Sequence, residues 1–268
     1  MDDILKIKNL NFNYNNHTIF NDLNLSLVHN EWYTLLGNNH SGKTTLVKII
    51  SGLIECQNEI EFDHLTLNRK NINKIRAKLS IVFTDLNSNF LFDDVYDEIT
   101  YELKNLKISE QEIKKRLDNI NKITNIKSII DQKISQLTNF DKIKVLLTSA
   151  LITQPKLLII DETFSSLNST YRKKVYELIQ KYKSKSKLTV LNISNNPEDI
   201  LISDNVLILE CGQILMNEKV KLVFTNGLLE QEKYKLPFVV ELSEYLKLYN
   251  LIDKNYTSIE ELTEALWK

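Results

Sequence analysis

One short segment of the chain has the residues and the spacing of a phosphate-binding loop. The sequence GNNHSGKTT follows an apolar run, Trp32 to Leu36, and precedes the helical pattern LVKII. A loop bounded by glycine between a strand and a helix turns backbone N–H groups and the positive end of the helix dipole toward a phosphate. The candidate nucleotide-binding residues are therefore those of the whole loop, namely Gly37, Asn38, Asn39, His40, Ser41, Gly42, Lys43, Thr44 and Thr45. This pattern predicts a site for the triphosphate of a nucleotide.

Individual side chains of the loop have expected roles. Lys43 is expected to reach the β- and γ-phosphates, and Thr44 is expected to ligate Mg²⁺. Thr45 is expected to donate to the α-phosphate. The expected cofactors are thus ATP and Mg²⁺.

A second apolar run supplies the carboxylates that such a loop needs. The segment LLIIDE, Leu157 to Glu162, places Asp161 at the end of a predicted strand, where it can hold the water shell of Mg²⁺. Glu162 is one residue further on and can polarise an attacking water. An isolated Asp-Glu pair could simply cap a strand in a turn, but the phosphate-binding loop favours the catalytic interpretation.

Composition restricts the class of protein. A chain of 268 residues is long enough for one large α/β core and a smaller helical part. Its 34 Lys and Arg nearly balance 35 Asp and Glu, so no nucleic-acid partner is expected. No apolar run approaches the roughly 18 residues that cross a bilayer, so any work at a membrane would be peripheral. Cys56 and Cys211 have neither disulfide nor metal-ligand spacing, which fits a reducing cytoplasm.

Hydrophobic periodicity predicts alternating strands and helices, and hence an α/β fold with a parallel sheet covered on both faces. The predicted strands are Leu5 to Phe12, Leu23 to Leu27, Trp32 to Leu36, Leu79 to Phe83, Leu157 to Ile160, Leu188 to Ile193 and Val206 to Leu209. The predicted helices are Lys43 to Ser51, Val95 to Leu106, Ser109 to Ile123, Phe140 to Ile152, Ser169 to Lys185, Pro197 to Ile202, Val239 to Leu248 and Ser258 to Trp267. The helical stretch Val95 to Ile152 is interpreted as an inserted subdomain.

These motifs together resemble the nucleotide-binding domain of ABC ATPases over about Ile4 to Glu218. The resemblance rests on the loop and the Asp-Glu strand on either side of a helical insertion, and on the following SSLN, Ser165 to Asn168. It implies a P-loop NTPase core with an N-terminal antiparallel β portion. It also implies that Tyr14 stacks on adenine, although an aromatic on an edge strand could instead cover the core.

Two segments resemble more narrowly the ATPases of energy-coupling-factor importers, which take up vitamins or metal ions. They are FTDLNSNFLFDDVYDEITYELKN and the tail VFTNGLLEQEKYKLPFVVELSEYL. The resemblance implies an ATP-binding domain over residues 1–222, with its helical subdomain at about 88–153. It also implies that residues 223–268 form a helical appendage that joins two ATPase subunits.

Several positions depart from the family pattern. Thr84 stands where the family has a glutamine that senses the γ-phosphate and Mg²⁺, and Asn195 stands at the position of a switch histidine. An amide has no cationic form to offset charge on the phosphate. Asn168 replaces the usual aspartate of the loop after the Asp-Glu strand.

The signature sequence, which in this family contacts the nucleotide of the partner subunit, is also altered. It reads Leu137-Thr138-Asn139-Phe140-Asp141, with Thr138, Asn139 and Phe140 as the candidate contacts. Phe140 adds bulk and Asp141 adds negative charge where phosphate should approach. Alternatively, Asp141 only stabilises the first turn of a helix.

The resemblance therefore implies a heterodimer with a better-preserved ATPase subunit at the cytoplasmic face of a membrane. The other expected partners are a membrane-spanning scaffold and a substrate-binding membrane protein. Retained Glu162 favours ATP hydrolysis, while Thr84, Phe140 and Asn195 favour a subunit that clamps ATP without splitting it. A soluble ABC protein that acts on ribosomes or DNA is a further alternative.

Overall fold

The computed structural model describes residues 2–15, 17–56, 59–83, 90–162, 164, 167–225, 227–231 and 234–267. Within these residues the central sheet has six strands in the order β10-β9-β3-β8-β7-β6. Its strands are β3 (Trp32–Leu36), β6 (Leu79–Val82), β7 (Leu157–Asp161), β8 (Thr189–Ile193), β9 (Asn205–Glu210) and β10 (Gln213–Lys219). All neighbouring pairs are parallel except β9 and β10.

A second sheet is antiparallel and has the order β2-β1-β4-β5 among the described residues. Its strands are β1 (Asp3–Tyr14), β2 (His17–Val28), β4 (Ile60–Phe62) and β5 (Leu65–Thr66). The buried carboxylate of Asp63, between β4 and β5, accepts hydrogen bonds of 2.6 Å from Lys78 and 2.7 Å from Lys156. These two lysines lie just before β6 and β7, so Asp63 ties the antiparallel sheet to the central one.

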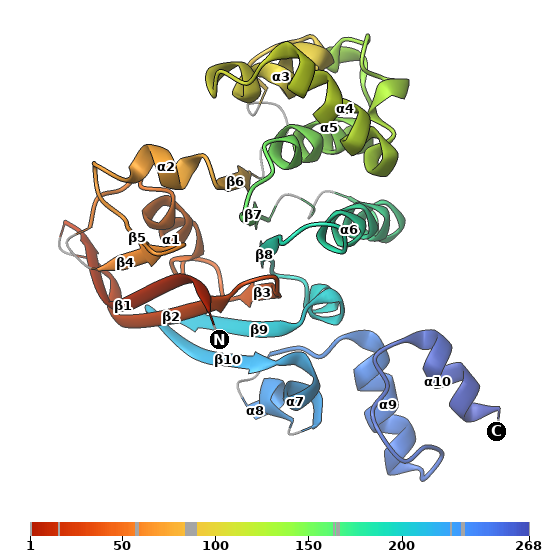
Figure 1. The fold of residues 1–268 in the computed structure, drawn as a ribbon. Coiled ribbons are helices and arrows are strands. Elements are labelled where there is room, and N and C mark those ends of the chain that lie inside the picture. The colour runs from red at the N-terminus through yellow and green to blue at the C-terminus, as the bar shows by residue number, and fades with distance from the viewer. Residues whose placement is uncertain are drawn as a thin grey trace.

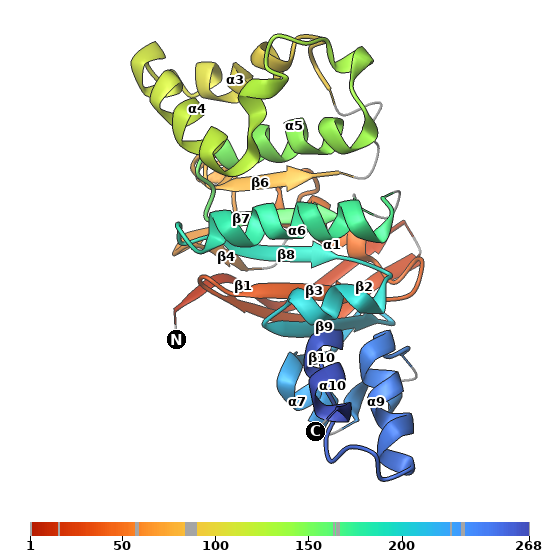
Figure 2. The same ribbon diagram turned by 90° about the vertical axis from the view of Figure 1, so that its right-hand side faces the viewer.

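Two groups of helices lie at opposite ends of the molecule. The α-helices are α1 (Lys43–Ile50), α2 (Ile72–Arg76), α3 (Val95–Asn105), α4 (Glu110–Thr124), α5 (Asn139–Ile152), α6 (Ser169–Lys183), α7 (Val220–Thr225), α8 (Leu228–Gln231), α9 (Phe238–Leu248) and α10 (Ile259–Leu266). Short 3₁₀ helices cover η1 (Ile126–Ser128), η2 (Ile134–Gln136) and η3 (Pro197–Ile202). In Figures 1 and 2, α3 to α5 lie at one end of the molecule, α7 to α10 lie at the other, and the sheets lie between them.

Strand β7 shows why the central sheet is apolar throughout. Leu157 and Ile159 pack in a cluster with α1 and the antiparallel sheet. Leu158 and Ile160, the alternate residues, pack in a cluster with α5 and α6. Because both faces of the sheet are covered, successive residues of the strand are all buried, as expected for a parallel sheet.

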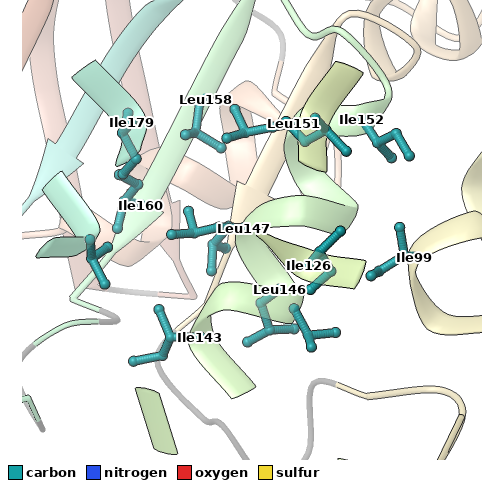
Figure 3. Packing of buried hydrophobic residues seen from close by; sticks show 14 of the residues in the cluster. Ile99, Ile126, Ile143, Leu146, Leu147, Leu151, Ile152, Leu158, Ile160 and Ile179 are labelled. Atoms are coloured by element: carbon teal, nitrogen blue, oxygen red, sulfur yellow. The ribbon is translucent and has the colours of Figure 1, made fainter. Parts of the chain in front are cut away.

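Helix α5 connects the helical insertion to the sheet. Figure 3 shows its residue Leu151 next to Leu158 of β7, and Leu147, together with Ile99 of α3, belongs to the same cluster. The appendage has its own cluster, in which Val240 of α9 and Leu262 of α10 pack with residues of β9. No helix within the described residues is long and apolar enough to span a bilayer.

The predicted elements are largely confirmed, and the differences are at ends and edges. The strand at Trp32–Leu36 has the predicted bounds, and the helix predicted from Ser169 to Lys185 ends at Lys183. Pro197–Ile202 is a 3₁₀ helix. Strands β4, β5 and β10 and helices α2, α7 and α8 were not predicted from the sequence.

Candidate nucleotide-binding site

The candidate site lies where three neighbouring parallel strands end. Strands β3, β8 and β7 are adjacent and parallel, so the segments that follow them meet at the carboxyl ends of these strands. Gly37 follows β3, Ser194 follows β8, and Glu162 follows β7. Ligands of open α/β sheets bind at this edge.

The backbone of the loop depends on its two glycines. A Cβ atom on Gly37 would lie 2.5 Å from the carbonyl oxygen of Leu209, so only glycine fits beside β9. Gly42 has φ +103°, and a Cβ atom there would lie 2.8 Å from the Phe20 ring. Gly42 is the N-cap of α1, and the loop therefore delivers the chain directly into the helix.

The first turn of α1 directs its donors toward the loop. The first intrahelical hydrogen bond is from Leu46 N–H to the Gly42 carbonyl, 2.8 Å. The N–H groups of Lys43, Thr44 and Thr45 precede it and have no partner within a helix. The Ser41 hydroxyl is buried and has no hydrogen-bond partner among the described residues. An anionic ligand could accept hydrogen bonds from these N–H groups and from the Ser41 hydroxyl.

Lys43 is buried and centred in this arrangement. Its ammonium group donates to the carbonyl oxygens of Gly37, 2.7 Å, and Asn38, 3.1 Å. It lies 3.6 Å from Oε1 of Glu162. The ammonium group thus bridges the loop and the carboxylate that follows β7.

A cavity of about 540 Å³ adjoins the loop, which is within the usual range for small-molecule sites. It is lined by His17, Ile19, Asn39, His40, Gly42, Lys43, Thr44, Thr45 and Glu162. His17 and Ile19 of β2 were not predicted, because nothing in their local sequence marks them. Tyr14 lies on β1, is 43% exposed, packs edge to face on Phe12 and is outside this lining, so its adenine-stacking role stays a prediction.

Asp161 and Thr44 form a donor set that suits Mg²⁺. Burial raises the pKa of Asp161, and the adjacent Glu162 raises it further. Lys43, Lys48 and a hydrogen bond with Thr44 act in the opposite direction. The buried Asp161 carboxylate, with the negative charge of Glu162 beside it and the Thr44 hydroxyl in contact, offers the oxygen ligands that Mg²⁺ prefers.

Glu162 and Asn195 are in direct contact. The Asn195 amide donates to Oε1 of Glu162, 2.9 Å, and lies 3.3 Å from Oδ1 of Asn39. Glu162 itself has φ +50°, and its N–H donates to the carbonyl of Ile193 on β8. Asn195 therefore links the switch position, the phosphate-binding loop and the candidate water-activating carboxylate.

The signature residues lie at a different place, the start of α5. The Thr138 hydroxyl accepts from the Asp141 N–H, 3.2 Å, and lies 2.8 Å from the Asp141 carboxylate, so the pair caps the helix. Phe140 stacks on Tyr171 of α6. Neither they nor Asn139 line the cavity at Lys43. Thr84, Ser165 and Ser166 lie outside the described residues.

Sequence reasoning also missed a contact between the loop and the C-terminal part of the chain. Oε1 of Glu210, at the end of β9, accepts from the Asn38 amide, 2.6 Å, and from the Tyr234 hydroxyl, 2.8 Å. A second cavity, of about 830 Å³, lies here. It is lined by Leu36, Gly37, Asn38, Asn39, Ser194, Asn195, Pro197, Glu210, Tyr234 and Lys235. No motif could have revealed this contact, because Asn38 and Glu210 are 172 residues apart in the sequence.

Comparisons with known proteins agree with this geometry. The family model "ABC transporter" matches residues 20–165. An energy-coupling factor transporter ATP-binding protein of Oenococcus oeni is 31% identical and covers 99% of this chain and 98% of the relative. An energy-coupling factor transporter ATP-binding protein of Onion yellows phytoplasma is 32% identical and covers 99% of this chain and 98% of the relative. The structure of cbiO1 from Clostridium perfringens, part of the ABC transporter complex cbiONQ, has a TM-score of 0.79 at 28% identity and covers 91% of this chain and 100% of that one.

The chain belongs to the ABC transporter family, among the ATP-binding proteins of energy-coupling factor transporters. Its fold is that of an ABC ATPase.

Proposed function

We propose that this chain binds Mg·ATP at residues 37–45 and hydrolyses it to drive import of a vitamin or metal ion. The observation that carries the proposal is the meeting of Lys43, Glu162 and the Asp161–Thr44 pair at one sheet edge. The segments that supply them are more than a hundred residues apart in the sequence. Phosphoryl transfer depends on positioning and charge stabilisation, and this geometry supplies both.

Each residue has a role in this proposal. The first turn of α1 and the Lys43 ammonium hold the phosphates, and Asp161 and Thr44 hold Mg²⁺. Bound Mg²⁺ would neutralise charge shared by the β- and γ-phosphate oxygens. Glu162 orients the attacking water, and Asn195, which donates to the same carboxylate, fixes its direction.

We also propose that the chain works in a complex at the cytoplasmic face of a membrane. The cbiO1 structure is described as part of a transporter complex, which supports membrane partners for this chain. A membrane-spanning scaffold and a substrate-binding membrane protein are the expected partners. Thr138, Asn139 and Phe140 lie outside the cavity of their own loop, which supports a second ATPase subunit whose nucleotide they face.

The second ATPase subunit is proposed to be a different chain. The Thr138 hydroxyl is already engaged with Asp141, and Phe140 is stacked on Tyr171. In a homodimer, both nucleotide sites would face a signature sequence with these altered contacts. A purified homodimer of this chain with transport-level ATP turnover would contradict the heterodimer, while co-purification of hydrophobic subunits from detergent-solubilised membranes would support the complex.

A second candidate function is a subunit that clamps ATP without splitting it. The contacts of Glu162 favour it, because Oε1 of this carboxylate accepts from Asn195 and lies close to Lys43. A carboxylate engaged in this way has fewer free positions for water.

Single-turnover ATP hydrolysis by the full-length chain, with and without its partner subunit, separates these functions. Glu162→Gln should slow hydrolysis by about a hundredfold or more and leave ATP affinity within about threefold. The matched control is Glu177→Gln on the exposed side of α6, which should hydrolyse ATP like the wild type. Wild-type hydrolysis no faster than the uncatalysed background, with Mg·ATP still bound, would establish the clamp instead. Hydrolysis above background that is equal in wild type and Glu162→Gln would remove the catalytic role of Glu162.

A further inference from the structure

Lys235, from the segment between α8 and α9, lies at the nucleotide-binding edge of the sheet. It lines the cavity of about 830 Å³ together with Asn38, Asn39 and Asn195. It also lines an adjacent cavity that contains Glu162 and Asn195. A cation from the C-terminal part of the chain thus borders both the phosphate-binding loop and the switch position.

The backbone on each side of Lys235 is anchored. Before it, the Tyr234 hydroxyl donates to Glu210, and the Tyr234 N–H donates to the Leu229 carbonyl, both at 2.8 Å. After it, the Phe238 N–H donates to Oε1 of Glu198 at 2.6 Å. Glu198 lies three residues after Asn195, so the anchors tie this segment to the switch segment itself. These hydrogen bonds on both sides therefore fix the position of the Lys235 backbone.

The charge of Lys235 is available to a ligand. Among the described residues no carboxylate forms an ion pair with it. Arg172, another cation bordering the Glu162 cavity, is instead 3.8 Å from Asp199. Lysine carries its charge on a flexible four-carbon stem, which gives it reach into the cavity.

Hydrolysis requires positive charge around the γ-phosphate. As the water oxygen bonds to the γ-phosphorus, the bond to the β,γ-bridging oxygen breaks, and ADP and phosphate form with the proton of water on the products. Negative charge spreads over the γ-phosphate oxygens and the leaving oxygen during this step. Asn195 can donate a hydrogen bond there but carries no charge.

We propose that Lys235 is a phosphate-facing cation that supplies the positive charge absent from position 195. This proposal rests on the proposed hydrolysis at Glu162. It makes the segment Tyr234 to Phe238 part of the ATP site. The site of this chain would then combine a neutral switch residue with a lysine contributed by the appendage.

A double-mutant cycle tests this proposal. The full-length wild type, Lys235→Ala, Asn195→His and the double variant are compared by single-turnover hydrolysis with the partner subunit, and ATP affinity is measured separately. Lys235→Ala should slow hydrolysis about tenfold while ATP affinity changes by less than about threefold. In the Asn195→His background the same substitution should have little effect, because histidine can carry the charge. Lys235→Arg should retain most of the wild-type rate.

The control is Lys181→Ala, an exposed lysine on α6 that lines neither cavity. An equal rate for Lys235→Ala and wild type, or an equal loss in both backgrounds, would overturn the role of Lys235. The Glu162→Gln variant in the same assay keeps the two proposals apart. If Glu162→Gln is slow and Lys235→Ala is normal, only the Lys235 proposal fails, whereas normal hydrolysis by Glu162→Gln removes both.

Discussion

At the scale of single residues, Gly42 sets the conformation of the phosphate-binding loop. Its φ of +103° is unfavourable for residues with a Cβ atom, and the Phe20 ring leaves no room for one. Glycine is scarce in this chain, with five in 268 residues, so its presence here indicates a steric requirement.

Gly42→Ala should lower ATP affinity at least tenfold and cost about 1–3 kcal/mol of unfolding free energy, because both strain and a clash follow. Titration with a fluorescent nucleotide and urea unfolding measure the two effects. Gly227→Ala is the matched control, since Gly227 also has positive φ, +61°, but lies between α7 and α8. The Gly227→Ala protein should lose stability and keep its ATP affinity. If it also lost ATP affinity, backbone strain outside the loop would be enough to disturb the site.

Asp63 makes stability depend on pH. Burial acts to raise the pKa of its carboxyl group, but hydrogen bonds and attraction from Lys156 and Lys78 outweigh burial and hold the pKa below its usual value. A lowered pKa stabilises the fold above the pKa of the unfolded chain, about 3.9, and this contribution disappears as the pH falls through the lower folded value.

Asp63→Asn should therefore cost about 2 kcal/mol at neutral pH, and the gap to wild type should shrink below about pH 4. Urea unfolding at a series of pH values measures it. Glu55→Gln, which breaks the exposed ion pair with Arg69, is the control and should change little. A gap that stays constant down to pH 2 would mean that the charge of Asp63 contributes nothing.

At the scale of elements, the start of α5 shows how an altered motif keeps a structural role. Thr138 and Asp141 cap this helix, so the residues that depart from the family signature still satisfy its first turn. The alternative interpretation of Asp141, as a residue that stabilises the helix, agrees with this contact.

Thr138→Ala should cost about 1 kcal/mol of unfolding free energy, because the Asp141 N–H loses its acceptor. Thr138→Ser keeps the hydroxyl and serves as the control, with a stability close to wild type. Urea unfolding compares the three proteins. Equal stability of the alanine and wild-type proteins would show that water replaces the cap.

The elements that sequence predicted are those with strong local patterns. Strands β3 and β7 are wholly apolar, and Lys43 and Asp161 follow from their spacing to these strands. Strand β10 was missed because it is an edge strand in which only Met216 is buried, so it carries no clear alternation. The positions of Lys235 and Glu210 beside the loop could not be predicted, because they depend on contacts that only the folded chain creates.

At the scale of the whole molecule, the appendage after residue 222 presents large apolar side chains to solvent. Leu248 and Tyr249 are each 76% exposed, and Trp267 is 86% exposed. Exposed apolar groups gathered on one part of a protein often mark an interaction surface. This supports the proposal that the appendage joins two ATPase subunits.

Leu248→Asp should weaken association with the second ATPase subunit at least tenfold, since it places a charge in a surface that loses water on contact. Analytical ultracentrifugation of the mixed subunits measures it. Leu53→Asp, at an exposed leucine outside the appendage, is the control and should associate normally. Unchanged association of the Leu248 variant would place the contact elsewhere.

The pairing of β3 also determines when the protein can fold during synthesis. Trp32 of β3 pairs with Val190 of β8, and Tyr33 pairs with Asn205 of β9, whereas the β1–β2 hairpin pairs locally. At about 5–20 residues per second the ribosome needs roughly 8–30 s to make the chain between β3 and its neighbours. The strand that carries the phosphate-binding loop is thus left apolar and unpaired on the nascent chain, and a ribosome stalled near residue 183 should hold it open to proteolysis until the remaining strands emerge.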